Sequence, residues 1–142
     1  MAVLLRDRIP HNRSGLNLLQ HIGDLVINIR QAVESKGYIL PQAPMPVGSY
    51  QATLYTDNFL YISGQLPVRN GELIYKGCLG KELTTDQGKA AAQLCALNFL
   101  SQLDGSLRDR KLKQVVKVEG YINASSSFTE HAEVLNGASD FL

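Results

Sequence analysis

The stretch FLYISGQLPVRNG, residues 59–71, organises the rest of the chain around it. It opens with the alternating pattern of a β-strand, breaks at Ser63-Gly64-Gln65, and reaches a hairpin turn at Asn70-Gly71. Ser-Gly-Gln at the end of a strand contributes little to the packing of a core. The segment therefore predicts a polar pocket where a sheet ends.

The strand in this stretch is predicted to pair with the segment before it. Residues 49–55 and 59–65 form a β-hairpin in this prediction, and the loop lies near residues 56–58. A two-residue loop can use either the first two or the last two of these loop residues. The sequence leaves both registers open.

The choice of register decides which side chains meet across the hairpin. A loop at the first two residues pairs Tyr50 with Ser63, and a loop at the last two pairs Tyr50 with Gln65. Either register brings a phenol and a hydroxyl or amide to one face, and Gly64 lets a backbone or ligand approach closely. The alternative is that Gly64 marks a bulge and Ser63 simply ends a strand.

A helix and an extended connector precede this hairpin in the prediction. The helix is capped by Ser14 or Asn12 and ends just before Gly37, with one apolar face made of Leu18, Ile22, Leu25, Val26, Ile29 and Val33. Residues 40–48 contain three prolines, which lack amide donors, so this stretch cannot continue the helix. It leads into the sheet as an extended segment.

The second half of the chain predicts a returning strand, a helix, another strand and a final helix. Residues 72–75 return from the Asn70-Gly71 turn, and residues 114–123 alternate with Val116, Val118, Gly120 and Ile122 on one side. Capping boxes open the two helices: Thr84 with Gln87, and Ser127 with Glu130. Their apolar faces are Ala90, Ala91, Leu94, Leu97 and Leu100 in the first, and Val134, Leu135, Ala138 and Phe141 in the second. This order predicts an α+β fold with helices on one face of a small mixed sheet.

Composition and charge narrow the class of protein. The chain has 142 residues, 44% hydrophobic residues and a formal net charge of +1, which fits one globular domain. The densest basic run, residues 108–113, is interrupted by Asp109 and is typical of a solvated loop, so we expect no nucleic-acid partner. No apolar run has the length of a membrane span, and residues 1–15 lack the apolar core of a secretory signal. An organellar targeting peptide is left open, with Asp7 against it.

The cysteines and histidines carry no recognisable metal or catalytic pattern. Cys78 and Cys95 are predicted to be free thiols in a reducing compartment, and we expect a cytoplasmic location. The histidines stand apart from one another and from the cysteines, at positions His11, His21 and His131. We therefore expect no metal site, and we find no activated Ser/His pair and no paired carboxylates at a spacing typical of catalysis.

At the level of motifs the chain resembles the RidA family, also called the YjgF/YER057c/UK114 family. The specific element is residues 61–67, Tyr-Ile-Ser-Gly-Gln-Leu-Pro, supported by Pro46-Val47-Gly48-Ser49-Tyr50 and by residues 134–139. Further matches are Gly71-Glu72-Leu73, Gly77, residues 82–88, Ala90-Ala91, Asn98 and Phe128. The resemblance covers about residues 40–142, and the preceding helix is similar to the longer branch of the family.

The resemblance implies a chorismate-mutase-like fold, assembled as a homotrimer with ligand clefts between subunits. Family members hydrolyse reactive enamines and imines, such as 2-aminoacrylate, to 2-keto acids and ammonia without a cofactor. Carried over by position, Tyr50, Ser63, Gly64 and Asn136 line the cleft and bind the substrate. The alternative for Asn136 is a helix-face amide that bonds to its own surroundings.

The resemblance also predicts what the chain lacks. The family places a carboxylate-binding arginine and a water-orienting glutamate in two C-terminal strands, and we expect both to lie beyond Leu142, so the catalytic residues are unknown. We expect residues 1–38 to be an N-terminal extension with a helix, and residues 39–142 an incomplete RidA-like domain that is inactive by itself. The first alternative function is a non-catalytic trimer that binds a small ligand or regulates a partner. The second, less favoured alternative is an endoribonuclease or translation inhibitor.

Overall fold

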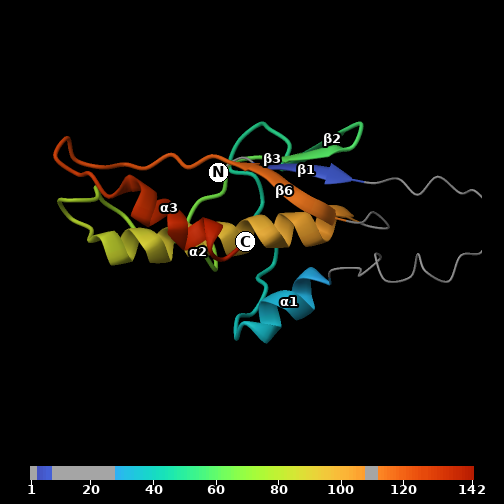
Figure 1. Ribbon diagram of the computed structural model, residues 1–142, viewed down its shortest axis with the longest axis horizontal. Coiled ribbons are helices and arrows are strands. Elements are labelled where there is room, and N and C mark those ends of the chain that lie inside the picture. The colour runs from blue at the N-terminus through green and yellow to red at the C-terminus, as the bar shows by residue number, and fades with distance from the viewer. Residues whose placement is uncertain (1–2, 8–27, 108–111) are drawn as a thin grey trace, which may run out of the picture.

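The computed structural model describes residues 3–7, 28–107 and 112–142 (Figure 1). Most of the predicted first helix, including the proposed caps Ser14 and Asn12 and the apolar positions from Leu18 to Val26, lies outside these residues. The described part is α1 (Ile29–Ser35), in which Ile29 and Val33 are buried as predicted. The Asn28 side chain caps it by accepting a 3.0 Å hydrogen bond from the Gln31 amide.

Four strands form the main sheet, in the order β2 (Thr53–Thr56), β3 (Phe59–Ile62), β1 (Val3–Asp7) and β6 (Leu112–Val118). Each neighbouring pair is antiparallel. Parallel pairing occurs among the described residues at isolated bridges outside the named strands, from Leu79 to Leu83 and to Ala124. The strand β1 was not predicted, and it occupies an interior position between β3 and β6.

The hairpin of β2 and β3 uses the second of the two registers that the sequence allowed. Thr56 pairs with Phe59, so the loop consists of Asp57 and Asn58, and Asp57 has φ 48°. The ladder continues past the strand ends with the Ser63 amide donating to the Ala52 carbonyl at 2.9 Å. Both strands are shorter than predicted, because the Tyr50 amide turns back to the Gly48 carbonyl at 2.9 Å and leaves the ladder.

The second hairpin and the long helix agree closely with the sequence. β4 (Val68–Arg69) pairs with β5 (Glu72–Leu73) across the Asn70-Gly71 turn, in which both central residues have positive φ, 53° and 81°. α2 (Thr85–Leu107) begins with both hydrogen bonds of the predicted capping box. The Thr84 amide donates to Gln87 Oε1 at 2.9 Å, and the Gln87 amide donates to Thr84 Oγ1 at 3.3 Å.

The predicted alternation along residues 114–123 is wrong. The partners of β6 jump from Lys117 to Val115, so a bulge takes Val116 out of the pattern and leaves it 45% exposed. Val115 and Val118 pack against the core instead. Beyond Val118 the chain is not part of a strand, although the Asn123 carbonyl accepts a 3.0 Å hydrogen bond from the Leu79 amide.

The second predicted capping box is also wrong, while the apolar face of its helix is right. α3 (His131–Ser139) begins after Glu130, which makes no side-chain capping bond. The Glu130 carboxylate instead accepts a hydrogen bond from Thr85 Oγ1, because the start of α3 lies against the start of α2. Of the predicted apolar positions, Val134, Ala138 and Phe141 are buried and Leu135 is half-buried.

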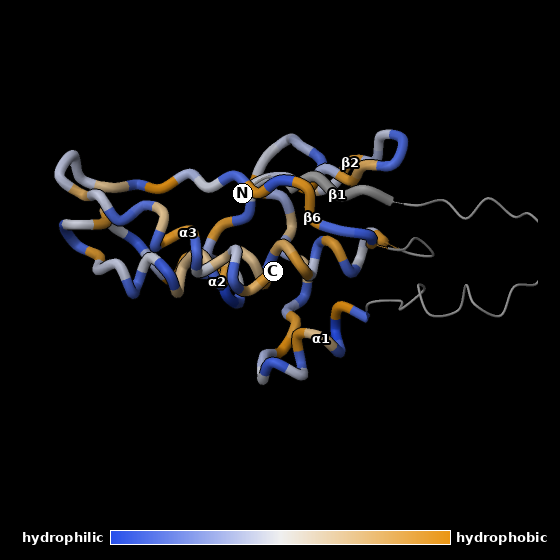
Figure 2. The backbone as a smooth tube through the Cα atoms, viewed as in Figure 1, coloured by the Kyte–Doolittle hydropathy of each residue, from blue (hydrophilic) through white to orange (hydrophobic). Residues whose placement is uncertain are grey.

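The helices and the sheet form layers around one core. Figure 1 shows α2 beneath the sheet, α3 beside α2, and α1 on the far side of α2 from the strands. Phe99 and Leu103 of α2 meet Leu60 and Ile62 of β3 in this core, where each of the four is at most 1% exposed. Apolar residues recur along α2, and the turn between β2 and β3 is hydrophilic (Figure 2). The predicted α+β class with helices on one face of the sheet is confirmed.

None of the helices in residues 28–107 and 112–142 has both the length and the apolar character needed to cross a lipid bilayer.

Candidate functional site

A groove of about 1020 Å³ runs between α2 and two loop segments. One wall is the proline-rich connector, residues 37–47, and the other comes from residues 64–71, which leave β3 and form the second hairpin. The floor comes from α2, and Tyr50 and Ala52 complete the lining. We call this the connector groove. The sequence predicted a polar pocket at the end of β3; a groove lies there, but many of the side chains that line it are apolar.

Two buried amides of α2 hold the walls of the connector groove in place. Asn98 Nδ2 donates to the carbonyls of Leu66 and Val68, both at 2.9 Å, and Gln102 Nε2 donates to the Pro44 carbonyl at 2.6 Å. Both side chains are buried, Asn98 at 1% exposure and Gln102 at 8%. A buried amide that binds backbone carbonyls fixes segments that lie outside the main sheet.

Sequence reasoning assigned no role in the site to these amides, although a signal was present. Asn98 and Gln102 are four residues apart, which places them on one face of a helix, next to the apolar Leu94. A polar pair on a buried helix face needs partners, so the spacing predicts contacts to a neighbouring segment. The structure identifies the connector and the second hairpin as those neighbours.

Two of the predicted site residues, Tyr50 and Gly64, line the connector groove together. Tyr50 is 46% exposed, and its ring lies so close to Gly48 that a Cβ there would be 3.4 Å from the ring carbons. No described residue accepts a hydrogen bond from the Gly64 amide. Tyr50 and the Cβ-free backbone of Gly64 therefore border the same groove.

Ser63 has a structural partner. Its hydroxyl donates to the Gln51 carbonyl at 2.6 Å, and it is not among the residues that line the groove. Gln65, which follows Gly64, does line the groove and donates from Nε2 to the Ser63 carbonyl at 2.9 Å. Ser63 thus supports the end of β3 next to the groove, and its oxygen keeps acceptor capacity for a further partner.

Asn136 lies apart from the other predicted residues. It is exposed on α3 and lines neither the connector groove nor a second, smaller pocket between α2 and α3, which is described below. Within one chain the structure therefore does not bring it to Tyr50 and Gly64. Its place in a cleft formed with a second copy stays a prediction.

The carboxylate-binding arginine and the water-orienting glutamate that the resemblance implies stay a prediction. Leu142 itself packs partly buried against the core, and its amide donates to the Ala138 carbonyl at 3.1 Å. The catalytic residues remain unassigned, and the binding roles of Tyr50, Ser63, Gly64 and Asn136 stay a prediction.

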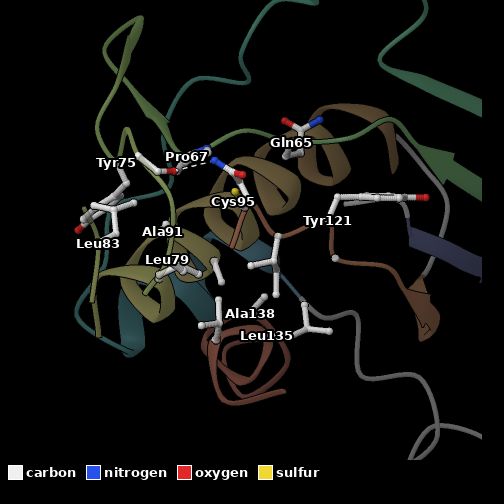
Figure 3. Close-up of a pocket in the computed structure, with 17 residues that line it drawn as sticks. Gln65, Pro67, Tyr75, Leu79, Leu83, Ala91, Cys95, Tyr121, Leu135 and Ala138 are labelled. Carbon is white, nitrogen blue, oxygen red and sulfur yellow. Dashed lines mark hydrogen bonds between the residues drawn. The ribbon is translucent and has the colours of Figure 1, made fainter. Parts of the chain in front are cut away.

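A smaller pocket of about 210 Å³ lies between α2, α3 and residues 120–123. Leu135 and Ala138 of α3 and Cys95 of α2 face it, whereas Tyr121 projects away and is 86% exposed (Figure 3). Burial raises the pKa of the Cys95 thiol to about 11, so this thiol is neutral at physiological pH and is a poor nucleophile. The lining is otherwise mainly apolar, and this pocket is less suited to catalysis than the connector groove.

The electrostatics of the connector groove depend on one residue. Among the described residues that line it, Arg69 of β4 is the one charged side chain. No three His, Cys, Asp or Glu side chains within the described ranges are grouped so that they could hold a metal ion. The groove offers hydrogen-bond donors and one cation, which suits an anionic ligand with polar groups at one end.

Comparisons with known proteins agree with this architecture. A family model described as "YjgF/chorismate_mutase-like, putative endoribonuclease" matches residues 30–142. Protein TCP17 of Trypanosoma cruzi is 41% identical over 107 residues, which are 75% of this chain and 67% of TCP17. The matched range 30–142 includes all four predicted site residues and both segments that meet at the groove.

Two solved structures have the same fold. Atu1372 of Agrobacterium tumefaciens, a protein described as having unknown function, matches with TM-score 0.72 and 32% identity, over 80% of this chain and 70% of its own. A "putative endoribonuclease" of Shewanella oneidensis matches with TM-score 0.74 and 34% identity, over 80% of this chain and 76% of its own.

Proposed function

Because the chain belongs to the YjgF/chorismate-mutase-like family, we propose that its site serves the hydrolysis of reactive 2-imino and 2-enamino acids of the 2-aminoacrylate type. The products are a 2-keto acid and ammonia, and no cofactor takes part. The observation that carries the proposal is the meeting of Tyr50 and Gly64 at one groove. These residues come from the two segments that carry the family's sequence signature.

The reaction needs a water molecule, a polarised carbon–nitrogen double bond and a bound carboxylate. Water adds to the imine carbon, and the carbon–nitrogen bond then breaks. The water oxygen becomes the keto oxygen, and both water protons leave with the nitrogen as ammonia. A chain that performs this reaction has to orient water and substrate and to donate hydrogen bonds to the atoms on which charge develops.

The residues at the connector groove suit these tasks. The Tyr50 hydroxyl can donate to or accept from a substrate, and Gly64, which has no Cβ, lets a substrate approach the backbone closely. Ser63, one residue before Gly64, keeps an acceptor oxygen at the edge of this arrangement. Asn136 belongs to the proposal as a residue that a neighbouring copy contributes.

We further propose a homotrimer. The outer face of the sheet carries exposed apolar side chains, since Leu54 and its cross-strand partner Tyr61 are 57% and 43% exposed and Val116 is 45% exposed. A neighbouring copy that covers this face would bury apolar area. Sedimentation of a compact monomer that hydrolyses an imine would contradict this part of the proposal.

An endoribonuclease is the second candidate, because the family description and the Shewanella protein carry that word. RNA binding depends on several Lys or Arg contacts to phosphates. The connector groove presents Arg69 as its single lining charge within the described residues, and the net charge of the chain is +1. These features favour a small anionic substrate over RNA.

One experiment separates the candidates. Imines are generated from L-amino acids by an amino-acid oxidase, and the release of 2-keto acid is followed with semicarbazide as a competing trap, with and without the 142-residue protein. Faster keto-acid release supports the proposal and contradicts the expectation that the chain is inactive by itself. Binding of the 2-keto acid without hydrolysis favours the non-catalytic ligand-binding alternative. Cleavage of a labelled RNA in a parallel assay, with no effect on imines, would overturn the proposal in favour of the endoribonuclease.

A further inference from the structure

We propose that residues 119–123 and the smaller pocket beside them bind an extended segment of another polypeptide. The bound segment continues the line of β1 in the main sheet and buries an apolar side chain in the pocket. Its chemistry is that of a β-strand with free backbone groups and with apolar side chains at every second position. The inference does not depend on the proposed function, because this pocket is separate from the connector groove.

The backbone of residues 120–122 forms no hydrogen bond with any described residue. β6 ends at Val118, and the chain then runs outside any strand. It is fixed again at Asn123, whose carbonyl accepts a 3.0 Å hydrogen bond from the Leu79 amide. Extended backbone without partners at the end of a sheet strand is a template for an added strand.

The segment that follows β3 forms the other side of the same site. β1 lies between β3 and β6, and Val3 pairs with Ile62 on one side and Val118 on the other. At these pairs β3 and β6 are two strand spacings apart, ~9.5 Å, so one strand fits between their continuations. Gln65 and Pro67 line the pocket from the side opposite α3 (Figure 3). We call the space between residues 63–67 and 119–123 the strand slot.

The pocket at the strand slot suits an apolar side chain. Its volume is about 210 Å³, and an apolar cavity of ~150 Å³ already holds a benzene molecule. Ala91 and Ala92 of α2 leave this space open, and Val134 and Leu135 of α3 supply aliphatic walls. An aliphatic side chain of the added strand would remove these surfaces from water.

A partner segment accounts for both features of the site, whereas other occupants account for one. A small apolar molecule fills the pocket but leaves the backbone of residues 120–122 unpaired. Each described strand of a second copy already has a neighbour on at least one side, whereas a strand in the slot needs both of its edges free. We therefore assign the slot to a different polypeptide.

The probe is an acetylated and amidated peptide of alternating valine and threonine, with a lysine at each end for solubility. We expect it to bind the 142-residue protein in calorimetry. The same peptide with N-methylated valines should bind at least about tenfold more weakly, because it lacks the amide donors along one edge.

A variant that fills the pocket tests where the peptide binds. Ala91→Leu should weaken binding of the alternating peptide by about tenfold or more, because the new side chain takes the space of the bound one. Ala90→Leu is the matched control. It adds the same bulk to α2 at a position that lines neither this pocket nor the connector groove, so its affinity should equal that of the parent.

Cys95 reports the occupancy of the pocket without any substitution. Its thiol lines the pocket, and the other free cysteine, Cys78, does not. With the peptide at about ten times its Kd, mass action predicts that methyl methanethiosulfonate modifies Cys95 about tenfold more slowly, and that the rate at Cys78 is unchanged. Mass spectrometry of the modified protein measures both rates.

The outcomes decide the inference independently of imine hydrolysis. No binding of the alternating peptide, equal binding of the N-methylated peptide, or unchanged affinity in Ala91→Leu would overturn it. Self-association of the protein that protects Cys95 without any peptide would mean that a second copy fills the strand slot, and this would overturn it as well. Peptide binding that shows these losses and protects Cys95 supports it, whether or not the protein hydrolyses an imine.

Discussion

Replacement of Asn98 by leucine should release the second hairpin from α2 and destabilise the fold. The Asn98 side chain is 1% exposed and donates two hydrogen bonds of 2.9 Å, to the Leu66 and Val68 carbonyls. A hydrogen bond of this kind contributes about 0.5–1.5 kcal/mol net, and leucine has as many side-chain heavy atoms as asparagine, so the replacement leaves no cavity. We expect Asn98→Leu to lower the free energy of unfolding by about 1–3 kcal/mol.

The assay is urea unfolding followed by circular dichroism, with Ser101→Ala as the control. Ser101 is also buried on α2, but its hydroxyl donates to the carbonyls of Leu97 and Asn98 in its own helix and holds no other segment. Its loss should change the free energy of unfolding by about 0.5 kcal/mol or less, because alanine has the higher helix propensity.

A second measurement connects the amide to the groove. Because Asn98 fixes the backbone of Leu66 and Val68 at the groove, Asn98→Leu should also weaken the binding of a 2-keto acid such as pyruvate, while Ser101→Ala should not. A stability change within about 0.5 kcal/mol of the parent, together with unchanged affinity, would refute the role given to this side chain.

Three further predictions concern single residues. Gly137→Ala should lower the free energy of unfolding by at least about 2 kcal/mol, because the new Cβ would collide with the Lys89 carbonyl. Gly105→Ala meets nothing within 4 Å and should raise it by about 0.5–1 kcal/mol, because alanine has the higher helix propensity. Equal stability of the two variants in urea unfolding would contradict the close packing of α2 and α3. Burial raises the pKa of the Cys95 thiol from its ordinary value of 9.0 to about 11, so the thiol ionises at lower pH in the unfolded chain than in the folded one. The free energy of unfolding should therefore fall as the pH rises from about 9 to about 11, and it should fall less in Cys95→Ala. Identical pH profiles of the two proteins would argue against burial of the thiol. Ser63→Ala should lower kcat/KM for imine hydrolysis, because it weakens transition-state binding by about 1–3 kcal/mol, and this loss should exceed the loss in the free energy of unfolding. Unchanged activity with a lower Tm would show that Ser63 only ends a strand.

Features set by neighbouring residues were predictable from the sequence. The Asn70-Gly71 turn needs two residues that tolerate positive φ, and the capping box of Thr84 and Gln87 closes over four consecutive residues. Both appear as predicted because their physical cause lies within the segment itself. The apolar face of α3 was predictable for the same reason, since helical periodicity is local.

Features that depend on distant partners were predicted poorly. Glu130 was assigned to a capping box with Ser127, but Thr85 of another helix competes for its carboxylate. The alternation along β6 was wrong at Val116, because pairing with β1 introduces a bulge that no pattern within residues 114–123 reveals. The interior position of β1 itself follows from pairing with β3 and β6, which are far away in the sequence.

The sequence by itself determined the α+β class, the two hairpin turns, the long capped helix and the family signature around Ser63 and Gly64. The tertiary structure decided which of these residues meet. It placed Tyr50 and Gly64 on one groove, gave Ser63 a backbone partner, and put Asn136 on a different surface of the chain. It also brought Arg69 to the groove by tying the second hairpin to Asn98. Turns and caps are closed by interactions over a few residues, whereas a binding groove forms where segments separated by dozens of residues pack together, and their contacts leave no periodic trace in the sequence.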